Sequence, residues 1–121
     1  MTERQLTAKV LKWARENIPH SCAIEVKLAR GKSISFHVLA EHQEHALMLA
    51  TGDGMCFKIP DGGWQNPFDG FVLKNEIAYV AVIFSPRIYY IPIWRWNEER
   101  STSSRKSLTE DRAKKISRYC A

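Results

Sequence analysis

The sequence predicts a single α/β domain in which helices flank one central mixed β-sheet. Three observations support this fold class: a helical apolar pattern opens the chain, a second covers residues 38–50, and short strand patterns fill residues 55–93. A length of 121 residues suits one domain with a sizeable core. Alternation of helix and strand patterns is typical of a layered α/β sandwich.

The first helix is expected to begin after Thr2. Thr2 and Gln5 have the T-x-x-Q spacing of a capping box, in which each residue satisfies a free amide of the first turn. Apolar residues then recur at helical spacing from Leu6 to Trp13, and Pro19 ends the run. One face of this helix is therefore expected to pack on the sheet.

The segment 22–28 predicts a strand, because apolar and other residues alternate along it. Positions 24, 26 and 28 are apolar and share one face. Glu25 and Lys27 share the opposite face, since side chains repeat every two residues along a strand. Further strands are expected at 34–36, 55–59, 68–74, 77–84 and 88–93. Residues 77–84 are apolar on both faces and predict a central strand.

After Trp96 the apolar pattern stops, and a last short helix is expected over residues 108–119. We therefore divide the chain into an α/β domain at 1–96 and a basic C-terminal arm at 97–121. Residues 95–121 carry eight basic and four acidic residues, a net charge of +4, whereas residues 1–94 carry ten and nine, a net charge of +1. Such an arm suits a polyanionic partner, and a solvated tail explains it equally well.

Two classes of protein are disfavoured by what the sequence lacks. No apolar run approaches the roughly 20 residues that span a bilayer, and no signal peptide opens the chain, so a cytoplasmic or other intracellular location is expected. Cys22, Cys56 and Cys120 form no C-x-x-C pair. Free or buried thiols are therefore expected instead of a disulfide framework or a zinc site.

Glu25 and Lys27 are the first candidates for chemistry. Phosphodiester hydrolysis uses carboxylates to hold Mg²⁺, and a nearby lysine can orient the attacking water. A lone E-x-K tripeptide is more often a solvated charge pair, so other features must support the hypothesis. In the 38–50 helix, His42 and Gln43 lie among apolar residues that should face the sheet. Asp69 enters a strand directly after a Gly-rich loop, where an aspartate can bind metal or cap local amides.

These motifs together resemble the PD-(D/E)XK nuclease superfamily. Glu25-Val26-Lys27 and the helix bearing His42-Gln43 are similar to the E-x-K strand and Gln-bearing helix of RecU-like and archaeal-type Holliday junction resolvases and their phage relatives. The similarity covers most of residues 22–94. It implies a restriction-endonuclease-like fold, Mg²⁺ as the cofactor with Mn²⁺ as a substitute, branched DNA as the substrate, a homodimer and a phage- or virus-encoded chain.

By this resemblance Glu25 is an expected metal ligand, Lys27 the base that orients the water, and Gln43 an accessory catalytic residue. Asp69 is the best candidate for the second metal ligand. The family's metal-binding aspartate precedes the E-x-K strand, whereas here Asp69 follows it. One interpretation is a rearranged sheet in which strand 68–74 lies beside strand 22–28. The other is a degraded site in a domain that only binds nucleic acid. Weaker accessory candidates are Glu16, His42, Lys58 and Asp61.

Basic side chains outside the site are the expected DNA contacts: Arg30, Lys32, Arg105, Lys106, Arg112, Lys114 and Lys115. Aromatic residues from Tyr89 to Trp96 alternate with Arg87 and Arg95, which suits base stacking but fits packing or a dimer interface better. The leading hypothesis is a structure-selective DNA endonuclease. The alternatives are a non-catalytic nucleic-acid-binding protein and a nuclease for another DNA structure.

Overall fold

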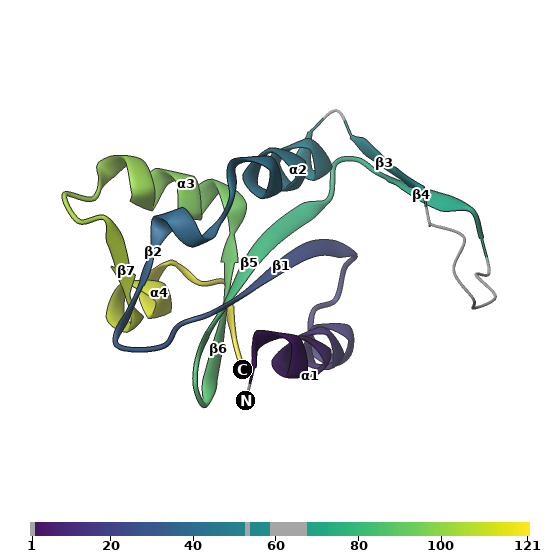
Figure 1. The fold of residues 1–121 in the computed structure, drawn as a ribbon. Coiled ribbons are helices and arrows are strands. Elements are labelled where there is room, and N and C mark those ends of the chain that lie inside the picture. Colours follow the sequence, from purple (N-terminus) through teal and green to yellow (C-terminus); the bar gives the residue numbers. More distant parts are fainter. Residues whose placement is uncertain (1, 53, 59–67) are drawn as a thin grey trace.

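The fold is known from a computed structural model that describes residues 2–52, 54–58 and 68–121 (Figure 1). Along the chain the elements are α1 (Glu3–Asn17), β1 (Cys22–Leu28), β2 (Ser33–Ser35), a 3-10 turn η1 (Phe36–Val38), α2 (Glu41–Thr51), β3 (Met55–Lys58), β4 (Gly70–Leu73), β5 (Ile77–Phe84), β6 (Arg87–Pro92), α3 (Ile93–Thr102), β7 (Ser107–Thr109), α4 (Glu110–Ile116) and β8 (Tyr119–Cys120). Of the described residues, no helix is both long and apolar enough to cross a membrane.

The main sheet is mixed and has the strand order β1-β5-β6-β8. Strand β1 runs parallel to β5, and β6 is antiparallel to both β5 and β8. A parallel pair needs a crossover between its strands, and the intervening chain supplies it through α2. The predicted α/β class, with helices flanking a mixed sheet, is therefore confirmed.

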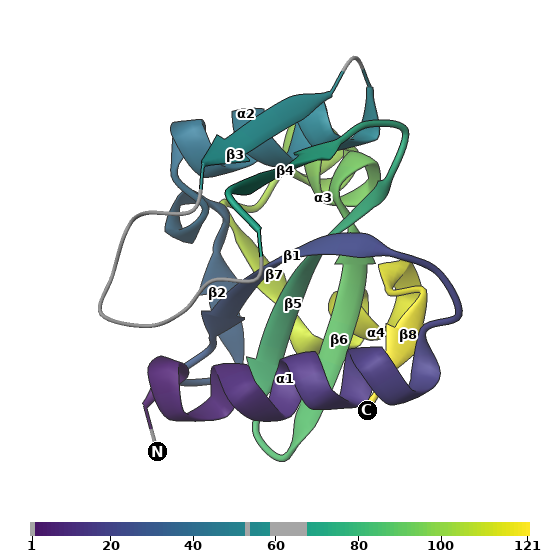
Figure 2. The ribbon, with the colours of Figure 1, turned by 90° about the vertical axis from the view of Figure 1, so that its right-hand side faces the viewer.

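Helices cover both faces of this sheet (Figure 2). Helix α1 lies across one face and buries Leu6, Val10 and Ala14. Helices α2, α3 and α4 cover the other face, where they contact β1, β5 and β6. The central strand β5 is almost entirely buried, as its apolar sequence predicts.

Helix α1 begins as the sequence predicts. The Thr2 hydroxyl accepts a hydrogen bond from the Gln5 amide at 3.2 Å, and the Gln5 side chain accepts one from the Thr2 amide at 2.8 Å. The buried Tyr90 hydroxyl donates to the Val10 carbonyl at 2.7 Å and so ties the helix to β6. A buried hydroxyl left without a partner would cost free energy, so this bond fixes where the helix lies.

Two short two-stranded sheets accompany the main one. Strand β2 pairs with β7, and β3 pairs with β4 in a hairpin that projects past the end of the main sheet (Figure 1). Our interpretation that the strand at 68–74 lies beside β1 is therefore wrong. The backbone of β4 pairs with β3 in the register Met55↔Leu73 to Lys58↔Gly70. Strand β3 is closer to β4 in sequence than β1 is, so pairing β4 with β3 closes a shorter loop and costs less conformational entropy.

The C-terminal segment also differs from the expected arm. The boundary expected between residues 96 and 97 falls inside α3, and β8 is the fourth strand of the main sheet. The helix expected at 108–119 is shorter, since β7 precedes α4 and β8 follows it. The physical reason is burial: Trp96, Leu108, Ala113 and Ile116 all pack in the core on the α2 face of the sheet.

Candidate functional site

The site is built on β1. Its register places Glu25 beside Val80 and Lys27 beside Val82, so both charged side chains lie on the α2 face of the sheet, as their spacing predicted. The Lys27 side chain is only 14 % exposed and that of Glu25 is 32 % exposed. Lys27 Nζ lies 3.6 Å from Glu25 Oε1. The strand therefore holds a half-buried ion pair beside the buried side chains of β5.

Gln43 joins this pair from the first turn of α2. Its Nε2 donates to Glu25 Oε1 at 2.9 Å, and its Oε1 accepts from the Ala40 backbone amide at 3.0 Å. The Ala40 amide needs an acceptor, so the side-chain oxygen faces it and the nitrogen faces Glu25. The hypothesis that Gln43 leans toward the sheet and the Glu25 strand agrees with this geometry. The Gln43 side chain therefore both caps α2 and holds the Glu25 carboxylate in place.

The Glu25 carboxylate has one engaged and one open oxygen. Oε1 receives both the Gln43 amide and the Lys27 ammonium. Within the described parts of the chain, no donor contacts Oε2. A carboxylate held through one oxygen in this way presents the other in a fixed direction, which is what a hard cation or a water molecule would require.

A cavity of about 460 Å³ opens at this cluster. It is lined by Cys22, Ala23, Ile24, Glu25, His42, Gln43, Ala46, Leu47, Phe71 and Leu73. Strand β4 therefore forms part of the wall, although it pairs with β3. Asp69 directly precedes β4 and lies two residues before Phe71. Asp69 is exposed in the bend that precedes the strand, and it is not among the residues that line the cavity.

The other candidate ligands lie apart from this cluster. His42 lines the cavity but is exposed, and Lys58 is exposed at the end of β3, opposite Gly70. Asp61 lies outside the described residues. Glu16 does not join Glu25: it is exposed on α1, which covers the opposite face of the sheet. In the described ranges, no group of three or more His, Cys, Asp or Glu side chains is placed to hold a metal ion.

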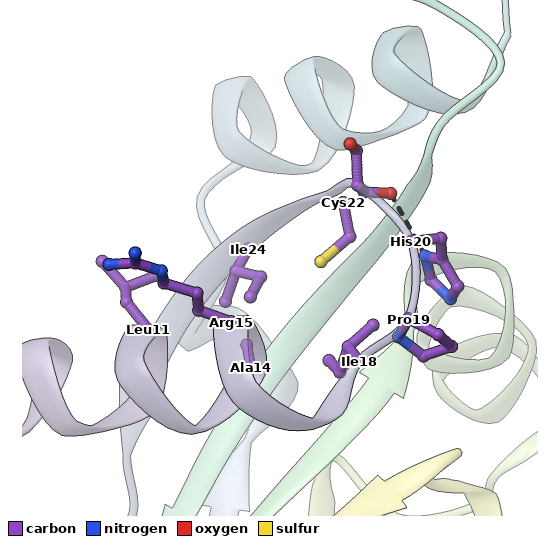
Figure 3. Close-up of a pocket in the computed structure, with 9 residues that line it drawn as sticks. Leu11, Ala14, Arg15, Ile18, Pro19, His20, Cys22 and Ile24 are labelled. Atoms are coloured by element: carbon purple, nitrogen blue, oxygen red, sulfur yellow. Dashed lines mark hydrogen bonds between the residues drawn. The ribbon is translucent and has the colours of Figure 1, made fainter.

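A second cavity, of about 440 Å³, lies on the α1 side of β1 (Figure 3). The Cys22 thiol and Ile24 point into it, facing Ala14 and Ile18 of the helix and its end. Burial raises the pKa of the Cys22 thiol, and the charge of Glu76 adds to this effect. The thiol is thus held protonated, which makes it a poor nucleophile. All three cysteines are free, as predicted.

The predicted DNA-contact residues fall into two groups. All seven are exposed at the surface: Arg30, Lys32, Arg105, Lys106, Arg112, Lys114 and Lys115. Arg112 is different, because its Nε and Nη2 donate to Glu99 at 2.9 and 2.8 Å. The Glu99 hydrogen bond raises the pKa of Arg112 above its ordinary value. This bidentate pair joins α4 to α3, so Arg112 has a structural partner.

Sequence reasoning missed part of the cavity wall. Phe71 and Leu73 come from a hairpin whose position depends on tertiary packing, and no local pattern marks them. The role of Gln43 as a cap had a local signal, because a glutamine at the third helical position is the capping-box residue even where the cap itself is Ala40.

Comparisons with known proteins identify no relative. No protein-family model matches the chain, and no curated protein and no solved structure matches it either.

Proposed function

We propose that the chain is a Mg²⁺-dependent endonuclease that acts on branched DNA, with the four-way junction as its substrate and a homodimer as its working form. The observation that carries this proposal is the cluster of Glu25, Lys27 and Gln43, in which one carboxylate is clamped through Oε1 and left open at Oε2. The restriction-endonuclease-like fold belongs to the same proposal. Its support is the unit β1–α2–β5, in which an E-x-K strand, a Gln-bearing helix and a parallel strand follow in order.

Glu25 presents the kind of oxygen ligand that a hard divalent cation binds. Glu25 Oε2 supplies one open carboxylate oxygen, and Asp69 is the second carboxylate that the proposal requires. When bound, Mg²⁺ activates a water molecule and stabilises the charge on the leaving oxygen. Oxygen ligands of this kind, with several waters retained, are what Mg²⁺ prefers in proteins.

Each side chain of the cluster has a distinct task in this proposal. Gln43 fixes the Glu25 carboxylate through its own double engagement with Ala40 and Glu25. Lys27, held within 3.6 Å of Glu25 Oε1, donates to the attacking water or to a phosphate oxygen and offsets the negative charge that develops there. Two such sites in a homodimer would cut two strands of a junction symmetrically.

A second candidate function is nucleic-acid binding without hydrolysis. The observation that favours it is that Glu25 is the one carboxylate at the cluster in the described part of the chain. Under this alternative Glu25 and Lys27 form only a half-buried ion pair. Nuclease activity on flaps, ends or duplex sites is a further variant of the main proposal.

Cleavage and binding assays separate these functions. The proteins to compare are wild type, Glu25→Gln, Asp69→Asn and the matched control Glu16→Gln, whose exposed carboxylate lies on the other side of the sheet. Four-way junction, flap, duplex and single-stranded DNA are incubated with Mg²⁺, and junction binding is measured in EDTA. We expect both site variants to lose cleavage at least 100-fold, on the order of one lost catalytic group, and to retain binding.

Each other outcome has a clear meaning. Wild-type cleavage by Asp69→Asn with loss in Glu25→Gln would remove Asp69 from the site. Binding without cleavage of any substrate by the wild-type protein, in Mg²⁺ and in Mn²⁺, would establish the non-catalytic alternative. Preferred cleavage of a flap or duplex would correct the substrate and leave the chemistry in place.

A further inference from the structure

The start of α3 presents an aromatic side chain that the fold does not use. Trp94 is 55 % exposed, although its neighbour Trp96 is fully buried. The Arg95 guanidinium lies over the Trp94 ring, with its Cζ 5.0 Å from the ring centroid. An exposed tryptophan with a cation against it is available to contact a further flat, electron-rich group.

A second arginine, Arg118, lines the same cavity as Trp94 and Arg95 and comes from the segment between α4 and β8. Arg118 Cζ lies 5.8 Å from the centroid of the Tyr119 ring, and Arg118 also acts on the buried Tyr79 hydroxyl, whose pKa it lowers against the larger effect of burial. Trp94, Arg95 and Arg118 line one cavity of about 380 Å³ together with Pro92 and Ser117. This volume lies in the range of roughly 300–1,000 Å³ that is typical of ligand sites.

The charged side chains that line this cavity, Arg95 and Arg118, are both basic, whereas a neighbouring pocket that shares Trp94 and Arg95 is also lined by Glu98 and Glu99. No acidic side chain is among the residues that line it, and in the described parts of the chain neither Arg95 nor Arg118 forms a salt bridge. Lys114 and Lys115, both exposed on α4, precede Arg118 by four and three residues. The N-cap of α3, Pro92, has no side-chain acceptor, so the first-turn amides add positive potential on the same side.

From this arrangement we infer that the Trp94–Arg95–Arg118 cavity binds a single-stranded segment of nucleic acid, with a base stacked on Trp94 and phosphates held by the two arginines. Aromatic platforms beside cations are how proteins bind unpaired strands, because each base has a face to stack and each phosphate a charge to neutralise. A base inside a duplex already has both faces stacked, so the cavity selects unpaired bases. The inference rests on the proposed function, which supplies DNA as the partner. It adds a second place on the protein at which branched DNA would bind.

The cavity is separate from the Glu25 site. Trp94 and Arg95 follow β6 and Arg118 precedes β8, whereas Glu25 lies on β1 at the other edge of the main sheet. Strands β1 and β6 are two positions apart, which corresponds to roughly 10 Å across the sheet.

Fluorescence titration in EDTA tests this inference without any need for cleavage. The probe is a labelled oligothymidylate of about twelve nucleotides, within the site size of single-strand-binding folds, compared with a duplex of the same length. We expect Trp94→Ala to bind the single strand roughly 5- to 100-fold more weakly, the range that loss of one stacked base produces, and Trp94→Phe to stay near wild type. Arg118→Ala should reduce the salt slope of binding by about 0.7.

Matched controls come from exposed residues of α1, which do not line this cavity. Leu11→Ala removes an exposed apolar side chain and Arg15→Ala removes an exposed positive charge, and neither should change the stacking-dependent affinity. Oligothymidylate binding that is unchanged in Trp94→Ala would overturn the inference. Binding of poly-glutamate as tight as that of the single strand would also overturn it, since a protein-like polyanion would then suffice.

The same set of variants separates this inference from the proposed nuclease. Trp94-dependent binding with no cleavage by wild type would sustain the single-strand site and reject hydrolysis. Cleavage by wild type together with Trp94-independent binding would sustain the nuclease and reject the single-strand site.

Discussion

The two faces of the main sheet use the same strand for different purposes. On the α1 face, Ile24, Val26 and Leu28 pack with apolar residues of β5 and β6. On the α2 face, β5 and β6 are equally apolar, but β1 places Glu25 and Lys27 there. One strand therefore contributes a wholly apolar surface to one layer and an ion pair to the other.

This difference bears on whether the Glu25–Lys27 ion pair contributes to the stability of the fold. Burying apolar area stabilises a fold by about 25 cal/mol per Å², whereas partly exposed ion pairs contribute about 0–1 kcal/mol. Apolar residues at positions 25 and 27 would serve the packing of α2 at least as well. The charged cluster, with Gln43 already engaged against it, is therefore the feature on which the proposed chemistry rests.

The largest expected effect concerns the charged side of this comparison. Lys27→Met keeps the length of a side chain that is 14 % exposed but removes its charge. We expect junction cleavage to fall by roughly 100- to 1,000-fold, since a group that stabilises the transition state is lost. The free energy of unfolding should change by less than about 1 kcal/mol. Single-turnover cleavage and urea unfolding measure the two quantities.

Lys12→Met is the control for this variant, because it removes an exposed lysine from α1 on the opposite face. Cleavage by Lys27→Met at the wild-type rate would remove Lys27 from the mechanism.

The next effect concerns the apolar face. Ile83, on β5, is 2 % exposed within the α1 cluster. We expect Ile83→Ala to lower the free energy of unfolding by about 2–5 kcal/mol, because the cavity left behind refills only in part. Cleavage per folded molecule should stay unchanged. Leu11→Ala, at a position 49 % exposed on α1, should cost less than about 0.5 kcal/mol in the same urea titration, and equal losses in the two variants would contradict the assigned burial.

Gln43 contributes to both stability and chemistry, and two substitutions separate its contributions. Gln43→Leu loses the acceptor for the Ala40 amide, so we expect a loss of about 0.5–2 kcal/mol in stability together with weaker cleavage. Gln43→Glu keeps an acceptor there but replaces the donor to Glu25 with a like charge. It should lower cleavage while thermal unfolding stays closer to wild type. The reverse order of stabilities would show that capping is not its structural role.

The smallest effect appears at alkaline pH. Burial raises the pKa of Tyr79, Tyr89 and Tyr90 to about 12, from an ordinary value near 10. Above pH 10 the unfolded chain releases these protons first, so the stability that the neutral hydroxyls contribute is complete below pH 10 and is lost between about pH 10 and 12. Tyr90→Phe should reduce the slope of unfolding free energy against pH in this range by about a third, since one of three such protons is removed. An unchanged slope would mean that Tyr90 ionises as freely in the folded protein as in the unfolded one.

Part of the site could be predicted from the sequence, because it depends on residues a few positions apart. Alternation along residues 22–28 determined that Glu25 and Lys27 share a face, and the helical spacing around Gln43 determined that it leans toward the sheet. The part of the cavity wall formed by Phe71 and Leu73 could not be predicted, because it depends on where a distant hairpin packs. Helix α3 was missed since Ile93 and Trp96 are its only buried apolar residues, and Glu99 fills the next inward position.

The sequence by itself determined the fold class, the capping box of α1, the burial of β5 and the charged face of β1, because each depends on periodicity or on residues a few positions apart. Tertiary structure decided which strands pair. It joined β4 to β3 instead of β1 and made β8 the fourth strand of the sheet. It also set Arg118 and Trp94 around one cavity. Pairing between distant segments follows from burial and hydrogen bonding summed over the whole chain, which no local pattern records.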